Sequence, residues 1–118
     1  MRAKVLFAFL ALLVTGSVSA QSGITVGNTS KSAGEGRWDW TVYITAEPAV
    51  LSQIRCVEYT LHPTFANPIQ RVCARGKDTR HAFPLSSNGW GEFTIKVRVF
   101  FANGKPQLID YPLKLGLS

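Results

Sequence analysis

The stretch FTIKVRVF, residues 93–100, carries the strongest structural signal in this sequence. Its apolar side chains occupy every second position, at Phe93, Ile95, Val97 and Val99. Because side chains of a strand alternate between two faces, this stretch predicts a β-strand with one buried face. Residues 102–106, which include Asn103 and Gly104, predict a turn into a second strand over residues 108–115. Together the two segments predict a β-hairpin.

The same two-residue period recurs earlier in the chain. Trp38, Trp40, Val42 and Ile44 alternate with polar or amphipathic residues. Residues 54–61 repeat the pattern, although Ile54 falls out of phase and indicates a β-bulge. Residues 69–74 predict a short strand, and residues 75–80 a polar loop. After residue 20 no stretch has a sustained helical period, so the fold class is all-β: an Ig-like β-sandwich of about seven to eight antiparallel strands.

The N-terminus has the features of a secretory signal peptide. Arg2 and Lys4 precede an apolar run over residues 5–14, which is shorter than the roughly 20 residues that span a bilayer. Val18 and Ala20 occupy the positions that signal peptidase reads, so cleavage is predicted after Ala20. Cleavage there would give a periplasmic or secreted protein with no membrane span after processing, which is what we expect. The alternative is that the apolar run is retained as a membrane anchor.

The rest of the chain predicts one domain. Residues 21–36 are rich in Ser, Gly and Asn and predict a flexible segment or an edge strand, and residues 37–118 predict the sandwich. The net charge is +6, and loss of Arg2 and Lys4 lowers it by two. This mild charge does not favour nucleic-acid binding. The basic cluster of Arg71, Arg75, Lys77, Arg80 and His81, interrupted by Asp78, is typical of a solvated face.

Cys56 and Cys73 are the two cysteines of the chain. In an exported protein they are predicted to form a disulfide, which would stabilise the domain by about 3 kcal/mol. They do not predict a metal site, because structural zinc usually has four ligands, and His62 and His81 lack zinc-finger spacing. We expect neither a metal nor a cofactor.

Several separate motifs resemble the YEATS domain family. They are His62, Pro63, Thr64 and Phe65, then Asn67 and Pro68, then Gly89, Trp90, Gly91, Glu92 and Phe93, and the pair Phe100 and Phe101. Trp40, Thr41, Val42 and Tyr43 look like the first long strand of the family, and residues 111–115 (YPLKL) like its closing strand. The order and spacing match over about residues 38–115.

The resemblance implies an Ig-type sandwich whose loops form a slot for an acylated lysine. The flat acyl amide would lie between the rings of Phe65 and Trp90. Thr64 would hydrogen-bond the amide, the backbone N–H of Trp90 would donate to the acyl oxygen, and His62 would line the slot. Gly89 and Gly91 would let the backbone approach the ligand closely. Trp38, where many members have histidine, would form the altered third wall.

Three function classes follow from these observations. The first is a non-catalytic binding module for an acylated lysine peptide or an N-acetylated glycan, since both present an amide. The second is a secreted structural domain that docks on a protein partner and has no small-ligand slot. The third is a hydrolase built on His62, Thr64 and Glu58, but no nucleophile elbow surrounds them. We expect no catalytic residues.

Overall fold

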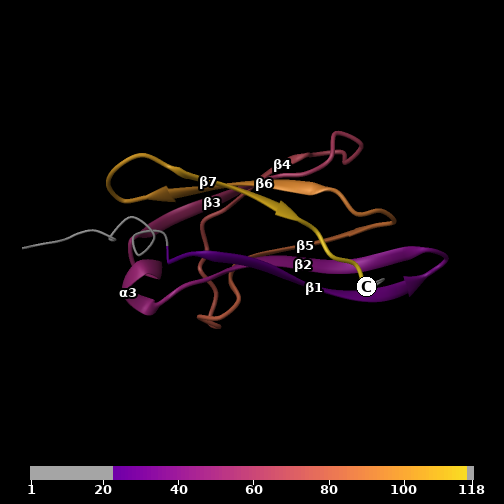
Figure 1. The fold of residues 1–118 in the computed structure, drawn as a ribbon, viewed down its shortest axis with the longest axis horizontal. Coiled ribbons are helices and arrows are strands. Elements are labelled where there is room, and N and C mark those ends of the chain that lie inside the picture. The colour runs from indigo at the N-terminus through magenta and orange to yellow at the C-terminus, as the bar shows by residue number, and fades with distance from the viewer. Residues whose placement is uncertain (1–22, 117–118) are drawn as a thin grey trace, which may run out of the picture.

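The structure is a computed structural model that describes residues 23–116 of the chain (Figure 1). The predicted signal peptide, residues 1–20, lies outside the described residues. The elements in chain order are β1 (Thr25–Gly34), β2 (Arg37–Thr45), α3 (Pro48–Leu51), β3 (Ile54–Thr60), β4 (Ile69–Val72), β5 (Ala82–Gly89), β6 (Thr94–Phe101) and β7 (Gln107–Pro112). Of the segment at residues 21–36, residues 25–34 form β1.

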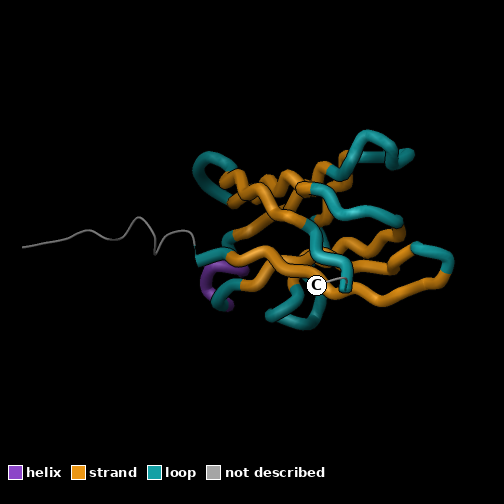
Figure 2. The backbone as a smooth tube through the Cα atoms, turned by 45° about the vertical axis from the view of Figure 1, so that its right-hand side comes forward, coloured by secondary structure: helices purple, strands orange, loops and turns teal. Residues whose placement is uncertain are grey.

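The strands form two antiparallel sheets that face each other (Figures 1 and 2). One sheet has the order β1-β2-β5, and the other has the order β4-β3-β6-β7. The prediction of an all-β, Ig-like sandwich is confirmed, with seven strands among the described residues. The predicted hairpin is also confirmed, because β6 and β7 pair in antiparallel register.

Alternating side chains of the two sheets fill the core. Residues Ile95, Val97 and Val99 of β6 are all buried, as the sequence pattern predicts. Val57 and Tyr59 of β3, the neighbouring strand of the same sheet, belong to the same buried cluster. The facing sheet contributes Trp40, Val42 and Ile44 of β2. Each large apolar side chain removed from water stabilises the fold by about 1.5–3 kcal/mol. The register of β3 against β6 shifts between Ile54 and Cys56, so the predicted irregularity at Ile54 is confirmed.

Strand β5 was not predicted from the sequence. Its segment, AFPLSSNG, contains proline, serine, asparagine and glycine, which are typical of turns. Proline is tolerated because β5 pairs only with β2 and forms an edge of its sheet. Phe83 has a φ of 49° beside a register shift in this pairing, yet its side chain is buried. A buried apolar residue in the left-handed region breaks the simple alternation by which strands are recognised.

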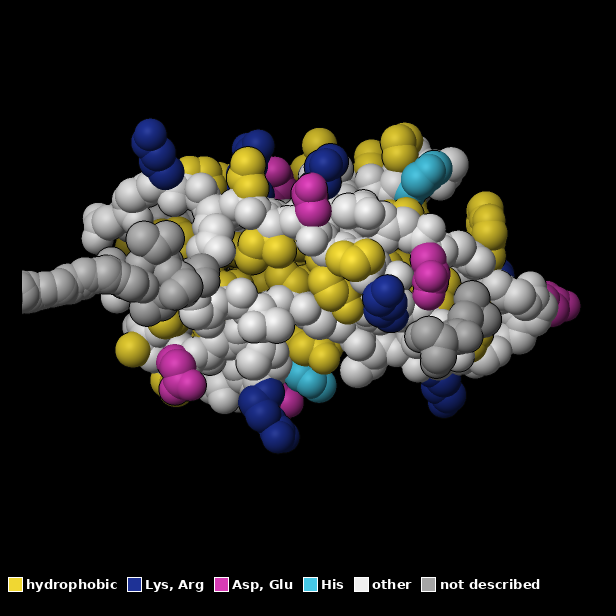
Figure 3. Space-filling model, viewed as in Figure 1, with side chains coloured by type: hydrophobic (Ala, Val, Ile, Leu, Met, Phe, Trp, Pro, Cys, Tyr) yellow, Lys and Arg dark blue, Asp and Glu magenta, His cyan; other side chains and the backbone are white. Residues whose placement is uncertain are grey.

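Polar side chains of β1 hold the segment that follows β7. Asn28 Nδ2 donates to the carbonyl of Lys114 at 2.7 Å, and Asn28 Oδ1 accepts from the Tyr111 hydroxyl and the Lys114 N–H. Ser30 Oγ accepts from the Gly116 N–H at 3.0 Å. The hydrogen bonds of Asn28 and Ser30 therefore join the two sheets along one side of the sandwich. In Figure 3 hydrophobic side chains are visible along the seam between the two layers.

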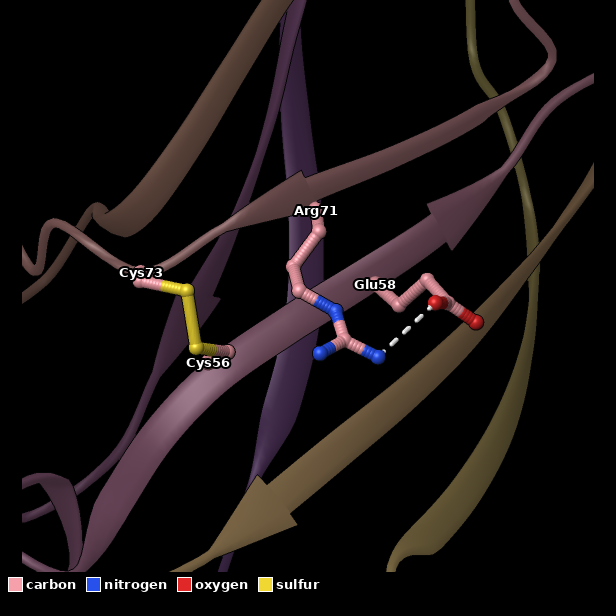
Figure 4. The surroundings of a disulfide bond; sticks show 4 residues. All are labelled: Cys56, Glu58, Arg71 and Cys73. Carbon is pink, nitrogen blue, oxygen red and sulfur yellow. Dashed lines mark hydrogen bonds and ion pairs between the residues drawn. A yellow bond between two sulfur atoms is a disulfide. The ribbon is translucent and has the colours of Figure 1, made fainter.

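A disulfide joins Cys56 and Cys73, so the structure contains the predicted pairing (Figure 4). The bond links β3 to the residue that follows β4, a strand of four residues at the sheet edge. On the same pair of strands, Arg71 Nη2 lies 3.2 Å from Glu58 Oε2. An ion pair this exposed contributes at most about 1 kcal/mol. The disulfide is thus the stronger constraint on the β3–β4 hairpin.

Replacing both cysteines with serine is expected to lower the free energy of unfolding by about 3 kcal/mol, because the unfolded chain is no longer restricted. Urea unfolding of the oxidised protein and of the double variant measures this difference. Reductant should destabilise the wild type and leave the variant unchanged. Identical unfolding curves for the two proteins would contradict the prediction.

Tyr59 gives the fold a dependence on alkaline pH. Its buried hydroxyl donates to the carbonyl of Phe83 at 2.7 Å, and burial raises the pKa of this phenol above its usual value. The unfolded chain loses the phenolic proton at a pH of about 10, whereas the folded chain retains it. The stability from this group is therefore full below about pH 10 and is lost as the pH rises further.

The Tyr59→Phe variant is expected to lose stability less steeply above about pH 10 than the wild type. A residual slope should remain, since burial also raises the pKa of Tyr111. At neutral pH the variant should be less stable by about 1–3 kcal/mol, because the buried Phe83 carbonyl loses its donor. Unfolding free energies measured from pH 8 to 11 test both effects. An unchanged alkaline slope would show that Tyr59 does not cause it.

Candidate functional site

A pocket of about 370 Å³ lies at the end of the sandwich where β3 and β5 finish and β2 and β6 begin. In Figure 1 this is the end that carries the β1–β2, β3–β4 and β5–β6 connections. The lining residues come from these connections and the adjoining strand ends: Arg37, His62, Thr64, Phe65, Ala66, Asn88, Gly89, Trp90, Gly91, Glu92 and Phe93. The volume falls in the range of small-ligand sites.

The β3–β4 connection has an ordered shape that presents His62, Thr64 and Phe65. Its ends are joined by the Leu61 N–H, which donates to the carbonyl of Pro68 at 2.7 Å. Within it, the Phe65 N–H donates to the His62 carbonyl at 3.0 Å. These two bonds fold the connection so that consecutive side chains reach the pocket instead of alternating across a strand.

His62 and Thr64 form a local hydrogen-bonded unit. The Thr64 N–H donates to His62 Nδ1 at 3.2 Å, so this ring nitrogen acts as an acceptor. The Thr64 hydroxyl also lies 2.9 Å from Nδ1, and in the tautomer in which Nδ1 is the acceptor it can donate its hydrogen to the same atom. As a result, the lone pairs of Thr64 Oγ1 are available to accept a hydrogen bond from a ligand.

Phe65 is anchored in an aromatic cluster beneath the pocket. Its ring centroid lies 5.5 Å from that of Phe93 and 6.3 Å from that of Trp40, with a T-shaped arrangement against Trp40. Such pairs contribute about 0.5–1.5 kcal/mol beyond burial. Phe65 is half-buried. It therefore forms a fixed apolar wall that is supported from the core side.

Trp90 is exposed, in contrast to the half-buried Phe65. It follows the end of β5, and 68% of its surface is exposed. The guanidinium carbon of Arg37 lies 5.1 Å from its ring centroid, within the distance of a cation–π interaction. A large aromatic ring this exposed contributes little to the core of the described fold and is available to a ligand.

The two glycines beside Trp90 differ in their surroundings. Gly89 is buried, and a Cβ placed there would lie 3.5 Å from Phe65 Cζ, which is ordinary van der Waals contact. A Cβ at Gly91 would have no neighbouring atom within 4 Å. The space beside Gly91 therefore leaves the backbone of this turn open to approach.

Trp38 does not line the pocket, in contrast to the prediction of a third wall. Its side chain is half-buried against the core, and its ring lies beside Gly116. The reason is the strand period, because Trp38 shares the inward face of β2 with Trp40. The structure brings the other six predicted residues, His62, Thr64, Phe65, Gly89, Trp90 and Gly91, around one pocket.

The prediction from the sequence missed three polar residues of the pocket, Arg37, Asn88 and Glu92. Arg37 Nε donates to Asn88 Oδ1, and Asn88 Nδ2 donates to Asp39 Oδ1 at 2.7 Å. Glu92 Oε2 accepts from the Leu115 N–H at 2.8 Å. Asn88 was missed because β5 was not recognised, and the antiparallel pairing of β2 with β5 is what places it opposite Asp39.

The arrangement gives no support to hydrolysis. Glu58, the acid considered as a partner for His62 and Thr64, instead pairs with Arg71 on the face of the β3–β4 hairpin that carries the disulfide (Figure 4).

Within residues 23–116, no three His, Cys, Asp or Glu side chains are grouped as metal ligands. No helix in the same part of the chain is long and apolar enough to cross a membrane.

Comparison with known sequences agrees with the resemblance of the sequence motifs to the YEATS family. A family model described as the prokaryotic YEATS domain matches residues 38–114. The AF-9 homologue of Mycosarcoma maydis is 29% identical over 114 residues, which cover 85% of this chain and 25% of that protein. The AF-9 homologue of Saccharomyces cerevisiae is 29% identical over 96 residues, covering 72% of this chain and 40% of that protein. The chain spans less than half of these relatives.

Solved structures agree with the sequence comparison. The yeast Yaf9 YEATS domain bound to H3K27ac is 28% identical, with a TM-score of 0.63, and the match covers 80% of this chain and 72% of that one. The structure of the Yaf9 YEATS domain that recognises an H3K122suc peptide gives the same identity and TM-score, with 79% and 72% covered.

Proposed function

This chain belongs to the prokaryotic YEATS domain family, and we propose that it is a non-catalytic module that binds the acyl amide of an acylated lysine. The observation that carries the proposal is the convergence of His62, Thr64, Phe65 and Trp90 on one pocket. The related Yaf9 domain binds acetylated and succinylated histone peptides, which supports the ligand class. The histone partner itself is not carried over.

In this proposal, the planar amide lies between Phe65, which the core supports, and the exposed ring of Trp90. The amide N–H donates to Thr64 Oγ1, whose own hydrogen is directed to His62 Nδ1. The backbone N–H of Trp90 donates to the acyl oxygen, and the open space beside Gly91 admits the ligand. Stacking supplies most of the affinity, and the two hydrogen bonds give the site its selectivity for an amide.

We further propose that the module works in the periplasm or outside the cell. The disulfide between Cys56 and Cys73 supports this location, because disulfides persist in oxidising compartments. There the ligand is an acylated lysine of an exported protein. An N-acetyl sugar presents the same acetamide group, and it is the competing ligand.

Calorimetric titration of the oxidised domain distinguishes these ligands. The ligands are an acetyl-lysine peptide, the same peptide with unmodified lysine, and N-acetylglucosamine. We expect saturable binding of the acetylated peptide alone. Binding of the sugar without the peptide would assign the pocket to a glycan. A domain that binds none of them would contradict the proposal and favour a structural role with a protein partner.

A further inference from the structure

We propose that Arg37 makes this pocket selective for acyl groups that end in a carboxylate, such as a succinyl group on lysine. This inference rests on the proposed function and specifies the substrate class of the same site. Arg37 stands at the start of β2 and lines the pocket together with Trp90. Its guanidinium carbon lies 5.1 Å from the Trp90 ring centroid, so the charge is located beside the expected position of the acyl amide.

Hydrogen bonds hold the guanidinium in place without neutralising it. Nε donates to the neutral amide oxygen of Asn88, and Asn88 in turn donates to Asp39. Among residues 23–116, no carboxylate lies within salt-bridge distance of Arg37. The terminal N–H groups of the guanidinium therefore remain available as a fork that matches the two oxygens of a carboxylate.

Glu92, the acidic residue of the pocket, is bonded to the segment that follows β7 and not to Arg37. Glu92 also lines the pocket, but its Oε2 accepts from the Leu115 N–H at 2.8 Å. Leu115 is fully buried, so this bond holds the carboxylate of Glu92 at the segment that follows β7. Asp39 is bonded to Asn88 and is absent from the pocket lining. Arg37 is the one arginine or lysine among the residues that line the pocket, and neither carboxylate is bonded to it.

A carboxylate that reaches Arg37 gains a charge-assisted hydrogen bond. Such a bond gives roughly a tenfold increase in affinity over a neutral group of the same shape. Because Arg37 is exposed, the gain should fall as ionic strength rises. A terminal amide has the size of a carboxylate without its charge. The succinamyl group is thus the matched neutral ligand.

Calorimetry on the oxidised protein tests the inference with lysine peptides that carry acetyl, succinamyl or succinyl groups. We expect the wild type to bind the succinyl peptide about tenfold more tightly than the succinamyl peptide. In Arg37→Gln the ratio of the two affinities should fall to about one, whatever the absolute affinities. Arg98→Gln, on the exposed face of β6, removes the same charge outside the pocket and should keep the ratio.

The possible failures are distinguishable. Equal binding of the succinyl and succinamyl peptides by the wild type would overturn the role of Arg37 and leave the acyl-lysine proposal intact. A preference that survives in Arg37→Gln would also overturn it. If no acylated peptide binds, the proposed function itself fails. An acetyl-lysine peptide with an adjacent glutamate completes the set, and an equal gain there would show that Arg37 reads the peptide instead of the acyl chain.

Discussion

Trp90→Ala is expected to weaken the binding of an acyl-lysine peptide by about 2 kcal/mol or more, roughly thirtyfold, while the domain stays folded. The ring is 68% exposed and lines the pocket, so its removal takes one of the two stacking surfaces from the ligand. Few core contacts are lost, and the free energy of unfolding should change by no more than about 0.5 kcal/mol. Calorimetry and urea unfolding measure the two quantities on one preparation.

The matched control is Leu108→Ala. Leu108 is an apolar side chain of β7 that is 69% exposed, and it is absent from the pocket lining. This variant should bind like the wild type. If Trp90→Ala instead unfolds the domain, its ring is part of the core in solution, and the structural reading of the protein is preferred.

Trp40→Ala should have the opposite effect and lower the free energy of unfolding by about 3–5 kcal/mol. Trp40 is 2% exposed, and its ring contacts both Phe65 and Phe93. Its removal leaves a cavity beneath the pocket and takes away the support of the Phe65 ring. Much of a typical stability of about 5–15 kcal/mol would be lost. Thermal and urea unfolding measure the effect.

Two further variants separate the causes. Trp40→Phe keeps an aromatic ring and removes the indole N–H, whose nitrogen is buried without a hydrogen-bond partner among the described residues. It should be less damaging than Trp40→Ala, because the retained ring fills most of the space that alanine would leave as a cavity. Trp38→Ala removes a half-buried ring outside the pocket and should cost less than Trp40→Ala. Equal losses from Trp38→Ala and Trp40→Ala would contradict the assignment of Trp40 to the centre of the core.

The sandwich could be predicted from the sequence where strands bury one face and expose the other. In β6 every second residue is apolar, and the structure buries those positions. The alternation of apolar and polar residues did not predict β5, because an edge strand tolerates Pro84 and turn-forming residues. It also missed α3, because four residues are too few to show a helical period.

The pocket could be predicted in part through the resemblance to the YEATS family. His62, Thr64 and Phe65 belong to one of the short motifs that carry the resemblance, and Gly89, Trp90 and Gly91 belong to another. Arg37 joins them only through the pairing of β2 with β5, which local sequence does not reveal. Trp38 was expected in the pocket because many members of the family have histidine at this position. Side chains on a strand change face at each residue, and it is the neighbouring Arg37 that lines the pocket. An error of one position therefore moves a side chain from the pocket to the core.

The most direct test of the acyl-amide pocket follows the three tryptophan indole N–H signals by NMR while a crotonyl-lysine peptide is added. The signal of Trp90, assigned by its absence in Trp90→Phe, should shift saturably. Trp40 should respond less, through Phe65, and Trp38 should stay in place because it lies beside Gly116. A stationary Trp90 signal at millimolar peptide, or a shift of Trp38 alone, would contradict a ligand site between Phe65 and Trp90.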